Sequence, residues 1–282
     1  MSGDYFIGVD GSGPGRAALR WGMQRAAERG AAVVLVHVVD DEWGLVGQDY
    51  AEEAQRQTVA LLAEEAGNAH AIADGVDIST RILHGSPSWE LAGLPSPEDL
   101  LIIGTHKTGF LRGRVLGSRS VQMVSAARSS VAIVPDSATS SRRGVVVGVD
   151  RFDGSKPAVA RGAREALSLG QELLLVHAPP SPQRTARSAD LPASTEAAQL
   201  LLANAAAAAS AAAPGVVVHR RLVHRAPAEA LLDASYDASL LVLGVSHRRS
   251  ATQTLIGSVT HDVLMNINVP VLVARSAGEP GD

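Results

Sequence analysis

The sequence predicts an α/β protein with two tandem doubly wound domains, each built on a five-stranded parallel sheet. Three observations predict this fold class. The chain repeats itself, strand and helix patterns alternate within each copy, and the strand segments are almost continuously apolar. Continuous apolar strands are typical of parallel sheets that helices cover on both faces.

The second half of the chain repeats the first half 140 positions later. Gly8-Val9-Asp10 returns as Gly148-Val149-Asp150, and Gly117-Ser118 returns as Gly257-Ser258. Many apolar residues can satisfy packing alone, so shared Asp, Gly and Ser residues at strand ends indicate one site design used twice. Each copy also has the usual size of a domain. We therefore expect one domain at residues 1–140 and a second at residues 141–282.

The first copy contains five short β-branched or aliphatic segments that end in turn residues or charges, as strands do. These are Tyr5–Asp10, Val33–Val38, Ile78–Leu83, Leu100–Gly104 and Val131–Val134. Between them lie four segments with apolar residues at helical spacing: Arg16–Arg29, Ala51–Ala73, Ser88–Leu94 and Ser118–Arg128. Strand and helix therefore alternate along the whole copy.

The second copy repeats this alternation. Its expected strands are Gly144–Val149, Glu172–His177, Val217–Leu222, Leu240–Gly244 and Val271–Ala274. Its expected helices are Lys156–Ser168, Thr195–Ala213, Ala228–Ala234 and Ser258–Met265. The alanine run at the end of the second helix is consistent with an ordinary surface helix, because Ala has the highest helix propensity and Pro214-Gly215 supplies a stop.

Composition argues against several classes of function. The net charge is −4 and there is no basic arm, which disfavours non-specific binding to nucleic acid or to an anionic membrane. The chain has no cysteine, which removes disulfides and thiolate chemistry and fits a reducing compartment. Met1 to Asp4 show no basic or apolar leader pattern before the first expected strand, and no apolar run approaches the roughly 20 residues of a spanning helix. We therefore expect a cytoplasmic protein.

The residues that indicate a ligand site lie at expected strand ends. In an open parallel sheet, ligands bind outside the carboxyl ends of the strands, where Asp10, Val38 and Gly104 are expected. A glycine-containing loop follows Gly104, and a helix then begins at Gly117-Ser118. Free backbone N–H groups and the helix dipole make such a helix start an anion site. The loop and helix start also carry basic residues, namely His106, Lys107, Arg112, Arg114 and Arg119.

These residues resemble the universal stress protein family, in the form of a tandem two-domain member. The resemblance rests on Gly8-Val9-Asp10-Gly11-Ser12, on Leu35-Val36-His37-Val38 and on the loop from Gly104 to Ser118. Nucleotide-binding members have a loop of glycine, two residues, glycine, nine residues, glycine, then serine or threonine. The first and last glycines and the serine match in both copies. The second glycine is replaced by Lys107 in the first copy and by His247 in the second.

The resemblance implies an adenine nucleotide alpha hydrolase-like fold with strand order 3-2-1-4-5, and ATP as ligand, with Mg²⁺ as a further candidate. It implies that Asp10 faces the ribose or the base, that the Val38 backbone meets the adenine edge, and that the segment from Gly104 to Ser120 holds the phosphates. It also implies a homodimer or an internal pseudo-dimer. The implied site residues are Val9, Asp10, Gly11, Ser12, Val38, Gly104, Lys107, Gly109, Arg114, Gly117, Ser118, Arg119 and Ser120 in the first copy, and Val149, Asp150, Ala178, Gly244, Gly257, Ser258, Val259 and Thr260 in the second.

Three functions stay open at this point. The first is an ATP-binding stress-response regulator with slow or no hydrolysis. The second is an interaction module that has lost nucleotide binding, because the Lys107 side chain could crowd the ligand. Alternatively, Lys107 could point outward or place its ammonium on a phosphate. The third is an enzyme that activates a substrate by adenylation. We expect no catalytic residue and no metal ligand.

Other motifs favour simpler interpretations. The turn Gly11-Ser12-Gly13-Pro14-Gly15 lacks the final glycine of a dinucleotide fingerprint, and the Walker signature is absent from both copies. His37, His84, His177 and His224 end expected strands, where we interpret them as hydrogen-bonded structural residues. Asp10 and Asp150 have a structural alternative as well, in which each caps the turn behind it.

Overall fold

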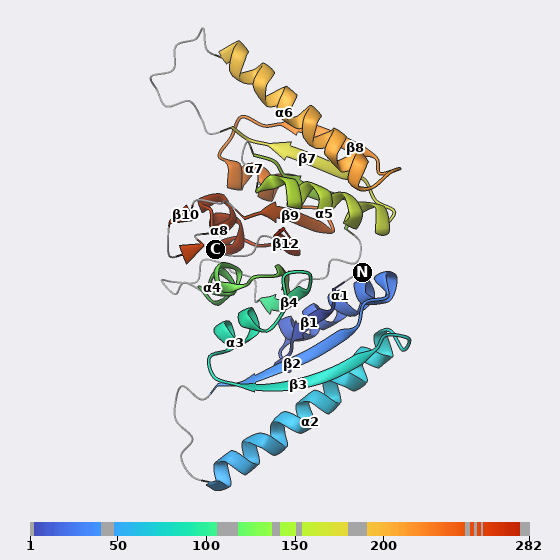
Figure 1. Ribbon diagram of the computed structural model, residues 1–282, viewed down its shortest axis with the longest axis vertical. Helices are drawn as coiled ribbons and strands as arrows, with labels where there is room; N and C mark the ends of the chain where they lie inside the picture. Colours follow the sequence, from blue (N-terminus) through green and yellow to red (C-terminus); the bar gives the residue numbers. More distant parts are fainter. Residues whose placement is uncertain are drawn as a thin grey trace. The chain divides into compact units, whose positions relative to one another are not determined.

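The computed structural model describes residues 3–40, 48–105, 118–136, 142–150, 154–179, 191–245, 249–250, 253–254 and 256–276. The chain divides into two compact units, with the change between Ser137 and Ala138. Each unit alternates strands and helices along the chain (Figure 1). Among the described residues, no helix combines the length and the apolar character needed to cross a membrane.

The first unit contains a parallel sheet of five strands in the order β3-β2-β1-β4-β5. The strands are β1 (Tyr5–Gly8), β2 (Val33–Val39), β3 (Ile78–His84), β4 (Leu100–Thr105) and β5 (Ser130–Pro135). The helices are α1 (Gly13–Arg29), α2 (Gln48–Ile72), α3 (Pro87–Gly93) and α4 (Ser118–Ala126). The predicted strand order 3-2-1-4-5 is confirmed in this unit.

The second unit has the same topology, with five parallel strands in the order β8-β7-β6-β9-β12. The strands are β6 (Val145–Gly148), β7 (Leu173–His177), β8 (Val218–Leu222), β9 (Leu240–Gly244) and β12 (Val271–Ala274). The helices are α5 (Ser155–Ser168), α6 (Leu191–Ala212), α7 (Pro227–Ala234) and α8 (Ser258–Met265). A small antiparallel pair, β10 (Arg249–Ser250) and β11 (Gln253–Thr254), was not predicted.

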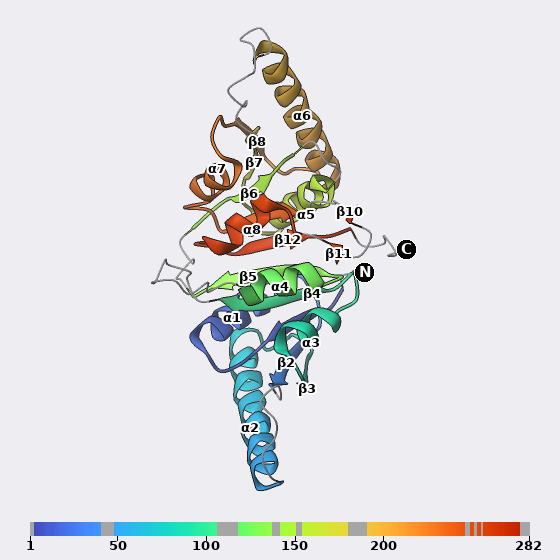
Figure 2. The ribbon, with the colours of Figure 1, turned by 90° about the vertical axis from the view of Figure 1, so that its left-hand side faces the viewer.

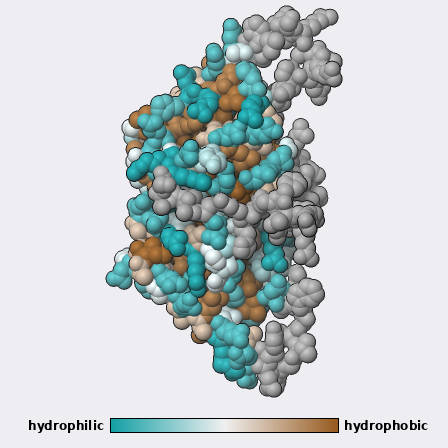
Figure 3. All heavy atoms as spheres, turned by 180° about the vertical axis from the view of Figure 1, so that it is seen from behind, coloured by the Kyte–Doolittle hydropathy of each residue, from teal (hydrophilic) through white to brown (hydrophobic). Residues whose placement is uncertain are grey.

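Helices cover both faces of each sheet, which explains the continuous apolar strands. In the first unit α1 packs against β1, β4 and α2, whereas α3 packs against α4 (Figure 2). Four consecutive residues of β4, Leu100 to Ile103, are all buried, because alternate side chains point to opposite covered faces. The face drawn in Figure 3 shows hydrophobic patches scattered among hydrophilic residues.

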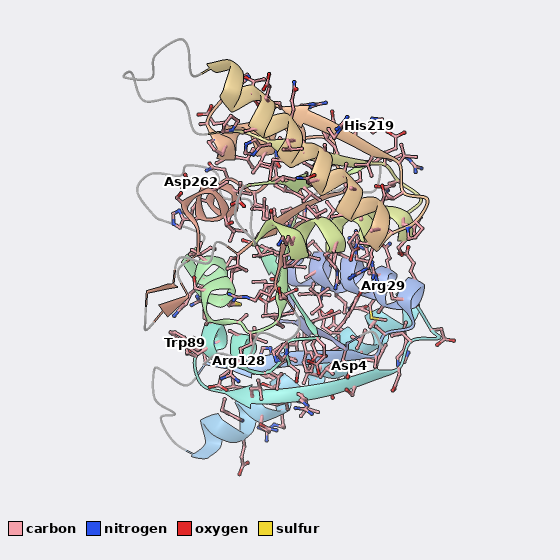
Figure 4. The ribbon with its side chains drawn as sticks, turned by 45° about the horizontal axis from the view of Figure 1, so that its top comes forward. Asp4, Arg29, Trp89, Arg128, His219 and Asp262 are labelled. Carbon is pink, nitrogen blue, oxygen red and sulfur yellow. The ribbon has the colours of Figure 1, made fainter. Side chains whose placement is uncertain are left out.

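The outer strands β3 and β8 are protected by polar and charged side chains. In β8 the imidazole Nε2 of His219 lies 3.0 Å from Glu172 Oε2, and both side chains are exposed (Figure 4). Arg220 and Arg221 follow on the same strand and are also exposed. Charges on an edge strand discourage pairing with another chain. The exposed ion pair itself contributes little to stability.

The start of α1 is set by a serine cap. Ser12 has an extended backbone, and its Oγ accepts a hydrogen bond from the Gly15 N–H at 3.1 Å. Pro14 occupies the first turn, where its fixed φ suits a helix and its missing N–H costs nothing. The helix therefore begins at Gly13, and the predicted start at Arg16 was too late. Gly11, just before the cap, has φ +73°, a conformation that favours glycine.

A close backbone contact joins the fourth strand of each unit to its first helix. A Cβ on Gly104, at the end of β4, would overlap the carbonyl group of Pro14 in α1. A Cβ on Gly244, at the end of β9, would overlap the carbonyl group of Gly154 beside α5. The absent side chains let the helix start lie directly on the strand end. We expected these glycines to let backbone donors approach the phosphates; the structure adds a packing requirement for the same residues.

Alanine at either of these glycines should destabilise its own unit. We expect Gly104→Ala and Gly244→Ala each to lower the free energy of unfolding by about 2–3 kcal/mol, because the clash is with rigid backbone. The control is Gly67→Ala in α2, where a Cβ meets nothing within 4 Å. That change should raise stability by about 0.5–1 kcal/mol. Urea denaturation followed by circular dichroism measures all three, and a neutral Gly104→Ala would contradict the packing argument.

Candidate functional site

A cavity of about 1040 Å³ lies in the second unit at the carboxyl ends of its central strands. It is lined by residues that follow β6, β7 and β9, and by residues of α6, α7 and α8. The carboxyl edge of a parallel sheet is where ligands bind in doubly wound folds. The cavity therefore occupies the position that the topology favours for a site.

The structure brings together all the residues that were predicted for the second site. Asp150 follows β6, Ala178 follows β7, and Gly244 ends β9. The complete predicted set that lines the cavity is Val149, Asp150, Ala178, Gly244, Gly257, Ser258, Val259 and Thr260. These residues come from four separate segments of the chain.

The start of α8 presents backbone N–H groups to this cavity. Gly257 is the N-cap with φ −63° and ψ 150°, and no side chain caps the helix. The first intrahelical bond runs from the His261 N–H to the Gly257 carbonyl at 2.9 Å. The N–H groups of Ser258, Val259 and Thr260 precede that bond and lie at the positive end of the helix dipole. This geometry suits an anionic group.

Thr260, one of the implied site residues, also makes a contact within the protein. Its side chain is buried, and Oγ1 donates to the Gly244 carbonyl at 3.4 Å. This long contact lies between α8 and the end of β9. Ser120 occupies the equivalent position in the first unit and is buried as well.

His177 joins the ends of two strands. Its Nδ1 lies 2.7 Å from the Val149 carbonyl, and in the first unit His37 Nδ1 lies 2.8 Å from the Val9 carbonyl. A carbonyl only accepts, so each ring carries its proton on Nδ1. These bonds fit the interpretation of the histidines as structural residues. The described residues contain no group of three or more side chains placed to hold a metal ion.

In the first unit the carboxylate of Asp10 is bound to the turn behind it. Its Oδ1 accepts from the Ser12 N–H at 3.0 Å and from the Ser12 hydroxyl at 2.5 Å. The structure thus shows the turn-capping arrangement that was considered as an alternative. Asp10 is nevertheless exposed, so the carboxylate also faces solvent.

The other predicted residues of the first unit are only partly described. Val9 is buried after β1, Val38 pairs with Leu83 between β2 and β3, and Arg119 is exposed in α4. Ser118 is the first residue of α4. The residues outside the described part of the chain are Lys107, Gly109, Arg114 and Gly117, together with His247 of the second unit.

The helix that follows the second strand differs in character between the units. In the first unit Arg16 of α1 binds α2, with Nη2 2.8 Å from Glu64 Oε1 and Nε 3.1 Å from Glu65 Oε1. Leu61 of α2 lies near Gly11, as a Cβ on Gly11 would be 3.0 Å from Leu61 Cδ1. The α2 helix therefore reaches the turn behind Asp10 with the apolar Leu61, while Glu64 and Glu65 of the same helix pair with Arg16.

In the second unit the corresponding helix, α6, contributes an apolar wall to the cavity. No residue of this helix was predicted as a site residue. Ala197, Leu200, Leu201 and Asn204 all line the cavity. Their spacing of three, four and seven residues places them on one helix face. The signal was present as a second apolar stripe beside the buried stripe that includes Leu202. The long alanine-rich helix concealed that stripe.

Comparisons with known proteins agree on one family. The model of the universal stress protein family matches residues 6–135 and 141–275. A universal stress protein of Mycobacterium tuberculosis strain H37Rv is 31% identical, over 96% of both chains. One of Mycolicibacterium smegmatis is 28% identical, over 95% of this chain and 96% of the relative. The crystal structure of a universal stress protein from Archaeoglobus fulgidus has a TM-score of 0.71 at 19% identity, covering 99% of this chain and 100% of that one.

Removal of the Arg16 guanidinium should destabilise the first unit. Glu65 is 1% exposed, so Arg16→Ala would leave a buried carboxylate without its cation. We expect a loss of about 1–3 kcal/mol in the free energy of unfolding, discounted because Arg16 is itself half-exposed. Arg56→Ala removes an exposed pair with Glu53 and should cost less than about 0.5 kcal/mol. Equal effects of the two variants in chemical denaturation would refute this difference.

Proposed function

Because the chain belongs to the universal stress protein family, we propose that it binds an adenine nucleotide, ATP, in the cavity of the second unit. One observation carries this proposal. The cavity joins the start of α8, with its three N–H groups, to Asp150 and Ala178 at neighbouring strand ends. An anion site and a carboxylate within one cavity at this edge of the sheet suit the two polar parts of a nucleotide.

In the proposed complex the phosphates lie at the start of α8. Gly257 supplies no side chain at the approach, and the Ser258 hydroxyl adds a donor beside the N–H groups. Asp150 faces the ribose or the base, and the Ala178 backbone meets the adenine edge. Leu231 and Leu243 add apolar area to the lining of the same cavity.

The donor set fits Mg²⁺ only as a companion of the phosphates. Asp150 is the single carboxylate among the described residues that line the cavity. Mg²⁺ is commonly held by one or two carboxylates together with phosphate oxygens. When bound, the ion would supply charge neutralisation at the phosphates, with Asp150 as its protein ligand.

We further propose a regulator with slow or no hydrolysis. The titratable side chains among the described lining residues are Asp150 and His177. His177 uses Nδ1 to hold the Val149 carbonyl, so it serves the fold at the same time. Nucleotide binding then influences the stress response through differential affinity for two states of the chain.

An equivalent site in the first unit, built from the residues predicted there, belongs to the same proposal. The proposal also includes the domain division at residues 140 and 141 and a cytoplasmic location. It includes a homodimer as well, and analytical ultracentrifugation would measure that oligomeric state. The interaction-module alternative rests on the replaced loop glycines, Lys107 and His247. Adenine released from denatured protein, seen by its absorbance at 260 nm, would count against that alternative.

Nucleotide-stripped protein should bind ATP in solution. We expect a saturable heat signal in isothermal titration calorimetry, and a rise in melting temperature that grows with ATP concentration, because binding to the folded state alone stabilises it. Titrations with and without Mg²⁺, and with AMP in place of ATP, measure the contribution of the ion and of the outer phosphates. No heat and no thermal shift at millimolar ATP and Mg²⁺ would refute the proposal.

A glutamate at the start of α8 separates binding from folding. Ser258→Glu places a carboxylate where the phosphates are proposed to lie, so ATP affinity at the second site should fall at least about tenfold. A negative charge at the start of a helix interacts favourably with the helix dipole and stabilises the fold by about 0.3–1 kcal/mol, so the melting temperature should not fall. Ser118→Glu makes the matched change at α4 and should leave the second site unchanged. The comparison is made with Ser118→Glu present in both proteins, so that only the second site differs. If adding Ser258→Glu to that protein leaves ATP affinity unchanged, the phosphates do not lie at the start of α8.

A further inference from the structure

The wall that α6 contributes to the second-unit cavity is aliphatic and open. Leu200 is 62% exposed although its side chain is apolar. It lines the cavity with Ala197 and Leu201, while Leu202 and Ala205 on another face of the helix are buried. A helix with apolar residues on both faces is typical of one that is covered on both sides. The apolar residues of α6 that line the cavity therefore suit an apolar occupant.

The aliphatic character extends to the other side of the cavity. Pro179 after β7, and Pro227 and Leu231 of α7, also line it. None of the described lining residues is Phe, Tyr or Trp. This part of the site therefore offers dispersion contacts and exclusion of water, without rings on which a second base would stack.

At the matched positions the first unit keeps Leu61 for Leu201 but has Gln57 for Ala197. Residues 140 positions earlier replace Leu200 by Ala60 and Asn204 by Glu64. Glu64 carries a negative charge and is 2.8 Å from Arg16. A charged, hydrated segment is a poor partner for an aliphatic group. The two units thus share their nucleotide residues but differ in the chemistry of the flanking helix.

The size of the cavity also favours a ligand with two parts. Small-molecule sites usually measure about 300–1,000 Å³, and this one reaches about 1040 Å³. The anion site of α8 and the aliphatic wall of α6 lie within the same cavity. One ligand that satisfies both must carry an anionic group and an aliphatic chain.

We infer that the second-unit cavity binds an adenine nucleotide that carries an aliphatic acyl group. The nucleotide part rests on the proposed function above. The phosphate, or an anionic replacement, lies at the start of α8, and the acyl chain lies against Leu200 and Leu201. The first unit, with Ala60 and Glu64 in place of Leu200 and Asn204, takes only the unmodified nucleotide.

Hydrolysis-resistant acyl sulfamoyl adenosines test this inference on the full-length chain. These probes carry an anionic sulfamate and an acyl chain, here of two, six or ten carbons. Burial of each added methylene should tighten binding by up to about fourfold, so the six-carbon probe should bind at least about tenfold more tightly than the two-carbon probe. Calorimetry gives both affinities. Affinity independent of chain length overturns the inference, as does decanoate alone binding as tightly as the ten-carbon probe.

A charged substitution in α6 tests whether the acyl group lies against this helix. Leu200→Glu should reduce the gain from two to six carbons to less than about threefold. Leu200 is mostly exposed, so the change does not disturb the core. Gln199→Glu adds the same charge to an exposed neighbour that does not line the cavity, and it should keep the full gain. A full gain in Leu200→Glu would overturn the inference.

The outcomes separate the two proposals. If ATP binds and the acyl series is flat, the aliphatic wall has another purpose and the nucleotide proposal stands. If neither ATP nor any probe binds, both proposals fail. If the six-carbon probe binds the wild-type protein more tightly than the two-carbon probe does, and Leu200→Glu removes that difference, both proposals are supported.

Discussion

The arrangement of each unit depends on a contact between two pieces of backbone. Gly104 and Gly244 end the fourth strands, and the missing side chains let Pro14 and Gly154 approach directly. Because the first helix starts on the strand end, the residues after the first and fourth strands are held side by side. In the second unit the same approach brings Asp150 and Gly244 to one cavity. A glycine required for packing is thereby also a requirement of the candidate site.

Duplication supplied one backbone plan, and the helix that follows the second strand then diverged. The strand order, the strand-end glycines and the hydrogen bond from His37 or His177 to a carbonyl are common to both units. The differences lie on surfaces that the sheet does not need. Arg16 and Glu64 join α1 and α2 by an ion pair, whereas Leu200 of α6 lines the cavity of the second unit. The two units therefore differ at helix positions that their shared sheet does not require.

The fold could be predicted from the sequence because its strongest signals are local and occur twice. Buried strands such as Leu240–Gly244 were placed at their true bounds, since strand residues covered on both faces must all be apolar. The start of α1 was missed because the cap is a geometric contact between Ser12 and Gly15, and Pro14 resembled a loop residue.

The site was predictable where the chain repeats and obscure where it does not. Asp150 and Ser258 were found from their counterparts, but Leu200 and Leu201 had no marker other than helical spacing in an alanine-rich segment. The contact between the Thr260 hydroxyl and the Gly244 carbonyl could not be predicted for another reason. A hydroxyl beside a helix start can donate to a ligand or to its own protein, and only the position of the Gly244 carbonyl decides.

The uncapped start of α8 has a consequence for the chain as a whole. The first N–H groups of α8 have no intrahelical partner, and Gly257 offers no side chain to accept from them. An anion that settles there completes the helix as its N-cap. If the proposed nucleotide binds there, its phosphates satisfy N–H groups of the first turn, so ligand binding and the stability of this helix are coupled.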